Sequence, residues 1–270
     1  MDEQEFGYIR REIQSLVGDD VTSYKPSQVQ RRLSVFLVRS GHAEWPAFFR
    51  AARADPPSLR KLRDYLTVNV SAFFRDPEKY AHLGETLLPQ LWRNRSALRV
   101  WSVGCAEGQE AYSLAILLAE SDRSSRQSHY ILGTDFDESA IEHGKAGGPY
   151  SSQEVTHVTK EQVSHYFQPV LRGYHIVDEL RTRVRFRKHN LLHDPFEGPF
   201  DLIACRNVII YFAPEIRETL YRRFREALIP GGVFFVGGTE TVANADALGF
   251  ETVGVSFYRR RPDKKPPVDC

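Results

Sequence analysis

The sequence predicts an α/β fold with a mostly parallel sheet, preceded by a smaller all-α part. Up to about residue 95, apolar side chains recur at helical spacing and no alternating strand interrupts them. From Ala97 onward, short apolar and β-branched runs alternate with helical stretches, which is typical of right-handed crossovers in a parallel sheet with helices on both faces. The 270 residues suffice for one large domain and a smaller attachment.

The N-terminal part is predicted to contain four helices, the last of which runs to Phe74. Their sequences are YIRREIQSLV, SQVQRRLSVFLVRSG, WPAFFRAARA and SLRKLRDYLTVNVSAFF. The pattern changes near Leu91 to Ala97. We therefore expect an all-α domain over residues 1–92 and an α/β domain over residues 93–270.

The α/β part is predicted from its runs of strand and helix residues. The strands are LRVWSVG, YILGTDF, VRFRKHNL, FDLIACRNVIIYF, GVFFVGG and a single last strand, TVGVSFYRR, and the main helices are EAYSLAILLAES, DESAIEHGKAG and PEIRETLYRRFREAL. Between Pro149 and Arg181 this rhythm lapses, and we expect a short helix (KEQVSHYF) and a hairpin-like extension (GYHIVDELRTRVRF). This small antiparallel β insertion, over about residues 150–181, is a candidate for recognition.

Composition excludes several classes of function. Hydrophobic residues make up 41% and charged residues 26%, as in ordinary globular proteins. No apolar run approaches the roughly 18 to 20 residues needed to cross a bilayer, and the N-terminus is acidic, unlike a signal peptide, so we expect a cytoplasmic protein without membrane insertion. The net charge of +1 argues against a nucleic-acid binder. Three distant cysteines and scattered histidines predict no metal site.

The first strand of the α/β part ends in a glycine-containing turn, VWSVGCAEGQEAYS. Ligands of open α/β sheets bind at the carboxyl ends of the strands, and Gly104 and Gly108 let the backbone approach a ligand closely. This spacing alone is weak, because any tight turn favours glycine. The second strand ends in Asp135, an acid suited to accept hydrogen bonds from the two hydroxyls of a ribose. Together the two features favour a nucleoside cofactor.

The charge of the turn favours one nucleoside cofactor over another. A dinucleotide site needs the G-x-G-x-x-G pattern, which this turn lacks. Glu107 and Glu110 would repel a pyrophosphate, whereas a carboxylate suits the cationic end of S-adenosylmethionine. S-adenosylmethionine is therefore the predicted cofactor, with S-adenosylhomocysteine as its product.

Six segments, in this order, resemble those of the CheR-type chemoreceptor glutamate O-methyltransferase family: NVSAFFRDPEKY, WSVGCAEGQEAYSLA, GTDFD, FRKHNLL, FDLIACRNVIIYF and GGVFFVGGTE. The resemblance implies an all-α substrate-recognition domain, then a Rossmann-like S-adenosylmethionine-dependent methyltransferase domain with a small antiparallel β insertion. It implies methyl transfer to glutamate side chains of chemoreceptors, forming methyl esters for sensory adaptation. We expect a monomer that acts on acidic cytoplasmic receptor helices.

The resemblance also implies site residues. Arg75 and Tyr211 are placed nearest the reacting atoms. Together with Gly104 from the turn, the expected cofactor contacts are Asn69, Ser71, Arg75, Glu110, Asp135, Asn190, Leu191, Asn207 and Val208. The sequence departs from the family pattern at Gln109 (commonly an acid), Ala111 (proline), Ser71 (threonine), Gly238 (histidine) and Thr239 (serine). We expect cofactor binding to survive these departures.

The expected chemistry requires positioning and no general base. A glutamate side chain has an ordinary pKa of about 4.3, so near pH 7 it is already an ionised nucleophile for in-line displacement at a sulfonium. Arg75 would orient that carboxylate, and the Tyr211 hydroxyl would hold the substrate or the amino acid portion of the cofactor. The alternatives are that Arg75 pairs with Asp76 and that Tyr211 is a core aromatic residue.

A basic stretch lies in the predicted all-α domain. From Lys25 to Arg63 there are nine basic residues and two acidic ones. Arg31, Arg32 and Arg39 recur at helical spacing, and a cationic helix of this kind would attract acidic receptor helices. A solvated helix face is the simpler alternative. Two further functions stay open: methylation of another substrate, and a catalytically silent cofactor-binding signalling module.

Overall fold

The chain forms two compact units, each described here by itself. The computed structural model describes residues 1–17, 25–66, 71–93, 95–121 and 129–263. The first unit comprises Met1–Asn69 together with Ile210–Arg217, and the second comprises Val70–Ile209 together with Glu218–Cys270. This division differs from the boundary that we expected near residue 92. The reason is packing: Phe73, Phe74 and Tyr80 are buried in the same hydrophobic cluster as the strands of the second unit.

The described residues before position 67 form four helices around an aromatic core. They are α1 (Glu3–Val17), α2 (Pro26–Arg39), α3 (Trp45–Ala54) and α4 (Pro56–Leu66). Trp45, Phe48 and Phe49 are almost fully buried, and Phe36 meets the Phe48 ring edge-on with centroids 5.4 Å apart. The predicted fourth helix is too long, because α4 ends at Leu66 and Phe74 adopts a left-handed conformation, φ 50°, that no helix contains.

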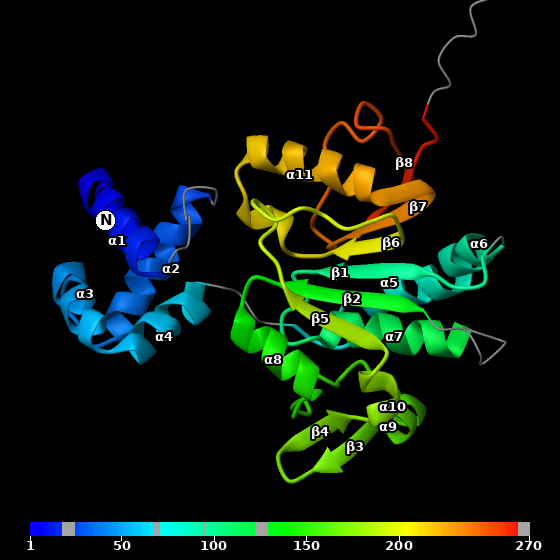
Figure 1. Cartoon of the computed structure of the whole chain (residues 1–270), viewed down its shortest axis with the longest axis horizontal. Helices are drawn as coiled ribbons and strands as arrows, with labels where there is room; N and C mark the ends of the chain where they lie inside the picture. The colour runs from blue at the N-terminus through cyan, green and yellow to red at the C-terminus, as the bar shows by residue number, and fades with distance from the viewer. Residues whose placement is uncertain (18–24, 67–70, 94, 122–128, 264–270) are drawn as a thin grey trace, which may run out of the picture. The chain divides into compact units, whose positions relative to one another are not determined.

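The second unit is built on a seven-stranded sheet with the strand order β5-β2-β1-β6-β7-β9-β8 (Figure 1). The strands are β1 (Arg99–Val103), β2 (Tyr130–Asp135), β5 (Val184–Lys188), β6 (Phe200–Cys205), β7 (Leu228–Val236), β8 (Phe250–Gly254) and β9 (Phe257–Arg260). The five strands from β5 to β7 pair in parallel, and β9 and β8 add an antiparallel edge. The prediction of a mostly parallel sheet is confirmed.

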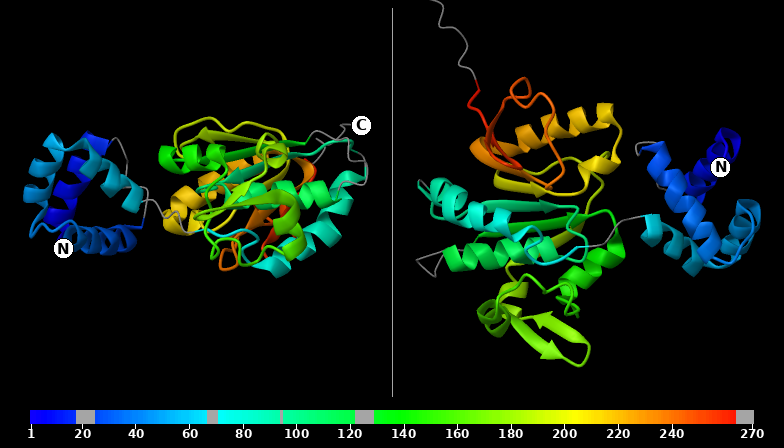
Figure 2. Two further views of the ribbon diagram at one scale, coloured as in Figure 1. Left: turned by 90° about the horizontal axis from the view of Figure 1, so that it is seen from below. Right: turned by 180° about the vertical axis from the view of Figure 1, so that it is seen from behind.

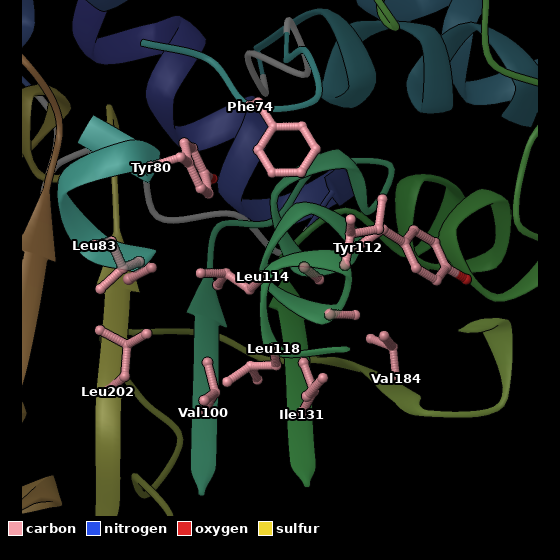
Figure 3. Packing of buried hydrophobic residues seen from close by; sticks show 14 of the residues in the cluster. Phe74, Tyr80, Leu83, Val100, Tyr112, Leu114, Leu118, Ile131, Val184 and Leu202 are labelled. Atoms are coloured by element: carbon pink, nitrogen blue, oxygen red, sulfur yellow. The ribbon is translucent and has the colours of Figure 1, made fainter. Parts of the chain in front are cut away.

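Helices flank the sheet of the second unit (Figure 2), and alternate side chains of each strand point to opposite faces of it. Val100 joins the cluster formed with α7 (Gln109–Ser121), as Figure 3 shows for Leu114 and Leu118. Its neighbour Trp101 points to the other face and contacts Phe224 of α11 (Pro214–Ala227), with ring centroids 5.8 Å apart. Helices therefore cover both faces, as a parallel sheet requires.

The remaining elements surround this sheet. Before β1 the chain forms α5 (Pro77–His82), the π-helix η2 (Leu83–Leu87) and α6 (Leu88–Trp92). After β2 come α8 (Glu138–Ala146) and α9 (Lys160–Tyr166), and the 3-10 helix η3 (Ile209–Tyr211) follows β6. No helix among the described residues is long and apolar enough to cross a membrane.

Two predicted β segments differ in detail from the structure. The hairpin of the insertion is formed by β3 (Phe167–Val170) and β4 (Gly173–Ile176), which directly follow α9. The segment that we expected to form the hairpin instead runs through β4 and α10 (Asp178–Arg181) into β5, whose partner is the central sheet. The predicted single last strand is the hairpin β8–β9, broken at Ser256, where φ is 72°.

Candidate functional site

The turn after β1 brings Gly104 directly against Val208. Gly104 has φ +65°, and a Cβ added to it would lie 2.4 Å from Val208 Cγ2. Such a Cβ is excluded both by this contact and by the left-handed backbone. The turn after β1 and the segment after β6 therefore pack at one edge of the sheet, where both were expected to contact the cofactor.

Asp135, at the end of β2, binds the same turn. Its Oδ2 atom accepts the backbone N–H of Ala106 at 2.9 Å, and Oδ1 accepts the N–H of Asp137 at 2.9 Å. Burial raises the pKa of Asp135. Backbone N–H groups occupy only part of the acceptor capacity of this carboxylate, so lone pairs remain that can accept hydrogen bonds from a ribose.

Glu110, in the first turn of α7, is linked to a buried arginine. Glu110 Oε1 accepts a hydrogen bond from Ser102 Oγ at 2.8 Å, and Oε2 lies 3.9 Å from Arg206 Nη1. Arg206 Nη2 donates to Asp76 Oδ2 at 2.5 Å, and the guanidinium lies over the Phe235 ring, 4.6 Å from its centroid. Burial raises the pKa of Glu110, and the charges of Arg206 and Arg75 oppose that rise. We did not single out Arg206 from the sequence, although a charged residue directly after the apolar strand run FDLIAC is a usable signal.

Arg75 is exposed and lies in an unusual backbone segment. Its neighbours Phe74 and Asp76 both have left-handed conformations, with φ of 50° and 62°. Non-glycine residues in this region are uncommon and concentrate at functional sites. Phe74 lies beyond the arrowheads of the strands in Figure 3. Asp76 pairs with Arg206 rather than with Arg75 in the described contacts. Ser71 is half-buried in the same segment, and Asn69 lies outside the described residues.

Asn190 and Leu191 form a tight loop after β5. Asn190 Oδ1 accepts the N–H of Leu192 at 2.9 Å, and the N–H of Asn190 donates to Asp194 Oδ2 at 2.8 Å. The carbonyl of Leu191 accepts a hydrogen bond from Arg223 Nη1 of α11 at 2.5 Å. Leu191 is 9% exposed. The loop is therefore fixed at both ends, while its expected contact with the adenine stays a prediction.

Asn207 is held by an acid that sequence reasoning missed. Its φ of 60° is left-handed, and its N–H donates to Glu240 Oε2 at 2.7 Å. The same oxygen accepts the N–H of Gly237 at 2.7 Å. Glu240 thus ties the segment after β6 to the segment after β7. An acid three residues after Gly237, the glycine that follows β7, was the available signal.

Tyr211 and the basic helix belong to the first unit. Tyr211 ends η3, and its carbonyl accepts the N–H of Lys25 at 2.9 Å. Arg31 and Arg39 are exposed on α2, whereas Arg32 is half-buried and donates to the Tyr65 carbonyl. Because Arg75 belongs to the second unit, its joint action with Tyr211 stays a prediction.

The described part of the second unit fits the predicted cofactor. Gly104, Glu110, Asp135 and Val208 lie at or near the carboxyl edge of adjacent strands β1, β2 and β6. The remaining lone pairs of Asp135 suit a ribose hydroxyl, and the carboxylate of Glu110 suits a cationic group. The missing Cβ of Gly104 lets the turn after β1 pack closely against Val208 at this edge.

Comparison with known proteins identifies the family to which both parts of the chain are similar. Residues 4–67 match the CheR methyltransferase all-alpha domain, and residues 69–258 match the CheR methyltransferase SAM binding domain. Chemotaxis protein methyltransferases of Listeria innocua and Listeria monocytogenes are 37% and 36% identical to the chain, each covering 95% of it and 97% of the relative. The chemotaxis protein methyltransferase of Salmonella typhimurium is 32% identical, over 87% of this chain and 76% of that protein.

Solved structures overlap with the chain only in part. PKMT2 from Rickettsia typhi in complex with AdoHcy is 20% identical, with a TM-score of 0.34, and the match covers 52% of this chain and 21% of that one. The assignment therefore rests on the two matched domains and on relatives that align along nearly the whole chain. The chain belongs to the CheR family of S-adenosylmethionine-dependent chemotaxis protein methyltransferases.

Proposed function

We propose that the protein transfers the methyl group of S-adenosylmethionine to glutamate side chains of chemoreceptors, forming the methyl esters that serve sensory adaptation. The observation that carries this proposal is the edge of the sheet at which Asp135, Glu110 and the Gly104–Val208 contact come together. Membership in a family of chemotaxis protein methyltransferases supports the choice of receptor as substrate.

The residues at this edge would hold the cofactor as follows. Asp135 accepts hydrogen bonds from the ribose with the lone pairs that Ala106 and Asp137 leave available. Glu110 supplies negative charge toward the cationic end. Asn190 and Leu191 lie around the adenine, Asn207 and Val208 make further contacts with the cofactor, and Asn69, Ser71 and Arg75 reach it from the segment before α5. When bound, the cofactor supplies an electrophilic methyl group.

The protein contributes positioning and desolvation to the reaction. The substrate carboxylate is ionised near pH 7, and the displacement needs oxygen, methyl carbon and sulfur in line. Arg75 is exposed, and its guanidinium is suited to grip a carboxylate through two parallel hydrogen bonds. The Tyr211 hydroxyl holds the substrate or the amino acid portion of the cofactor. Both side chains act by orientation, and neither transfers a proton.

The exposed cations of α2 form the proposed docking surface for the acidic helices of a receptor. Arg31 and Arg39 are exposed and available for long-range attraction. Both Arg32 and Arg39 lie over the Tyr65 ring, 5.1 Å and 5.6 Å from its centroid, but Arg32 differs because it is half-buried and also donates a hydrogen bond to the Tyr65 carbonyl. We therefore assign recognition mainly to Arg31 and Arg39. The protein acts as a cytoplasmic monomer in this proposal.

The test is transfer of a labelled methyl group from S-adenosylmethionine to receptor-rich membranes. We expect incorporation that mild base releases as methanol, the mark of a carboxyl ester. Base-stable incorporation would indicate an amine or amide target, and cofactor binding without incorporation would indicate a silent signalling module. Arg75→Ala and Tyr211→Phe should each lower turnover. Unchanged turnover in both variants would contradict the assigned roles.

A further inference from the structure

Gln109, the first residue of α7, lies beside the carboxylates of Glu107 and Glu154. Its Nε2 atom donates to Glu154 Oε1 at 2.7 Å, and the charge of Glu154 is close enough to contribute to the raised pKa of Glu107, after the larger effect of burial. The side chain is almost completely buried. Because only Nε2 can donate to a carboxylate, the orientation of the amide is determined. An acid at position 109 would place a third carboxylate among these groups.

Glu154 connects three segments. Its Oε2 atom accepts the N–H and the hydroxyl of Ser151, both at 2.8 Å, while its backbone carbonyl accepts the N–H of Phe73 at 2.9 Å. The loop after α8 is thus joined through Gln109 to the start of α7, and through the carbonyl to the segment that leads into Arg75.

Phe74, the residue after Phe73, is held by a side chain of α7. The N–H of Phe74 donates to Ser113 Oγ at 2.9 Å, and Ser113 Oγ donates to the carbonyl of Gln109 at 2.7 Å. Two consecutive N–H groups immediately before Arg75 are therefore fixed by Gln109, Ser113 and Glu154. This is the support that a left-handed Phe74 requires, since such a backbone persists only where its surroundings determine it.

We propose that Gln109 and Glu154 form a positioning pair that holds the Phe73–Phe74 segment against α7 and so sets the place of Arg75 beside the cofactor. The inference rests on the proposed role of Arg75. It also explains why an amide at position 109 is compatible with this site. The Gln109 amide donates a hydrogen bond to the Glu154 carboxylate. Exchanging the amide and the carboxylate between the two positions should preserve this hydrogen bond.

The test uses Gln109→Glu, the exchange Gln109→Glu/Glu154→Gln, and Gln153→Glu as the matched control, because Gln153 is exposed and adjoins Glu154. Gln109→Glu should weaken S-adenosylhomocysteine binding and lower kcat/KM about tenfold, a coupling typical of contacting residues in one network. Gln153→Glu should match the wild type, and the exchange should restore most of the loss. A loss that the exchange does not recover, or no loss at all, would overturn the proposal.

A second comparison separates positioning from general damage. In an Arg75→Ala background, Gln109→Glu should lower kcat/KM less than twofold, because the residue on which it acts is gone. An equal tenfold loss in both backgrounds would show that the pair does not act through Arg75. Cofactor binding is measured by calorimetry without any receptor, so those results hold even if receptor methylation fails. Loss of folding in Gln109→Glu, with no recovery by the exchange, counts against the pair.

Discussion

The guanidinium of Arg206 lies 3.9 Å from the carboxylate of Glu110, and the Arg206 side chain is only 2% exposed. The same guanidinium bonds to Asp76, next to Arg75. A buried charge of this kind depends on its partners, because removing one of them leaves the other uncompensated. Arg206 therefore connects the first turn of α7 to the segment that carries Arg75.

Replacing Arg206 by methionine should destabilise the protein by about 3 to 5 kcal/mol, the usual cost of breaking a buried ion pair. The measurement is the free energy of unfolding in urea. Arg222→Ala is the control, since Arg222 pairs with Glu218 on the surface of α11, with exposures of 62% and 57%. That change should cost under about 0.5 kcal/mol. Equal effects of the two variants would contradict a special role for Arg206.

Gly104→Ala should be more damaging than an alanine at another left-handed glycine. Gly231 has φ +83° and no atom within 4 Å of an added Cβ, so Gly231→Ala reports backbone strain alone, about 1 kcal/mol. Gly104→Ala adds the clash with Val208, which we expect to cost about 1 to 3 kcal/mol more. Unfolding free energies measure both. The double variant Gly104→Ala/Val208→Ala should regain the stability lost to the clash but not the stability lost to backbone strain. If it regains none, the contact with Val208 is not the cause of the additional loss.

The stability of the free protein and its affinity for the cofactor should change in opposite directions with pH. Burial raises the pKa of both Asp135 and Glu110, so the folded protein binds these protons more tightly than the unfolded chain does. Their contribution to stability therefore declines as the pH rises from the ordinary carboxyl pKa of about 4 through the raised values. Affinity for S-adenosylhomocysteine should instead fall on acidification, because ribose hydroxyls donate to the ionised form of Asp135.

This pH dependence is measured by calorimetry with S-adenosylhomocysteine and by thermal unfolding without it, between about pH 4 and 8. Glu110→Gln is the matched variant, since the difference from the wild type isolates one carboxyl group. The wild type should lose stability relative to Glu110→Gln as the pH rises. The opposite trend would show that Glu110 is stabilised as a carboxylate in the free protein.

Charge reversal on α2 should weaken receptor methylation without changing cofactor affinity. We expect Arg31→Glu/Arg39→Glu to lower kcat/KM for receptor membranes about tenfold at low salt, and the difference should shrink as salt screens the attraction. Arg50→Glu on α3 is the control, because Arg50 is also exposed. Equal activity of the variant and the wild type at low salt would refute a docking role for Arg31 and Arg39.

The sequence was informative where the signal is local. The periodicity of apolar residues predicted the helices of the first unit and the parallel strands, and the ends of β1 and β2 located Gly104 and Asp135 at one edge. Local pattern was less reliable at breaks. Ser256, with its left-handed backbone, divides a continuous β-like run into β8 and β9, and nothing in the residue type announces this.

The contacts that support the site could not be predicted from the sequence, because the two residues of each pair are far apart in it. Arg206 meets Asp76 across 130 positions, and Gln109 meets Glu154 across 45. Neither pair has a spacing that periodicity detects. The fold brings these partners together, so Gln109 looked like a departure from a motif when taken without Glu154.

The eight residues Ile210–Arg217 group with the first unit, although the chain on either side of them belongs to the second. The all-α unit is thus discontinuous in sequence. When the N-terminal helices are exchanged between relatives, the parent that supplies this short internal segment must also be chosen. A chimera that takes residues 1–69 from one parent and the rest from another would split the unit between parents. Matching residues 210–217 to the N-terminal parent is the natural design, and it would carry Tyr211 along with the helices that are proposed to recognise the receptor.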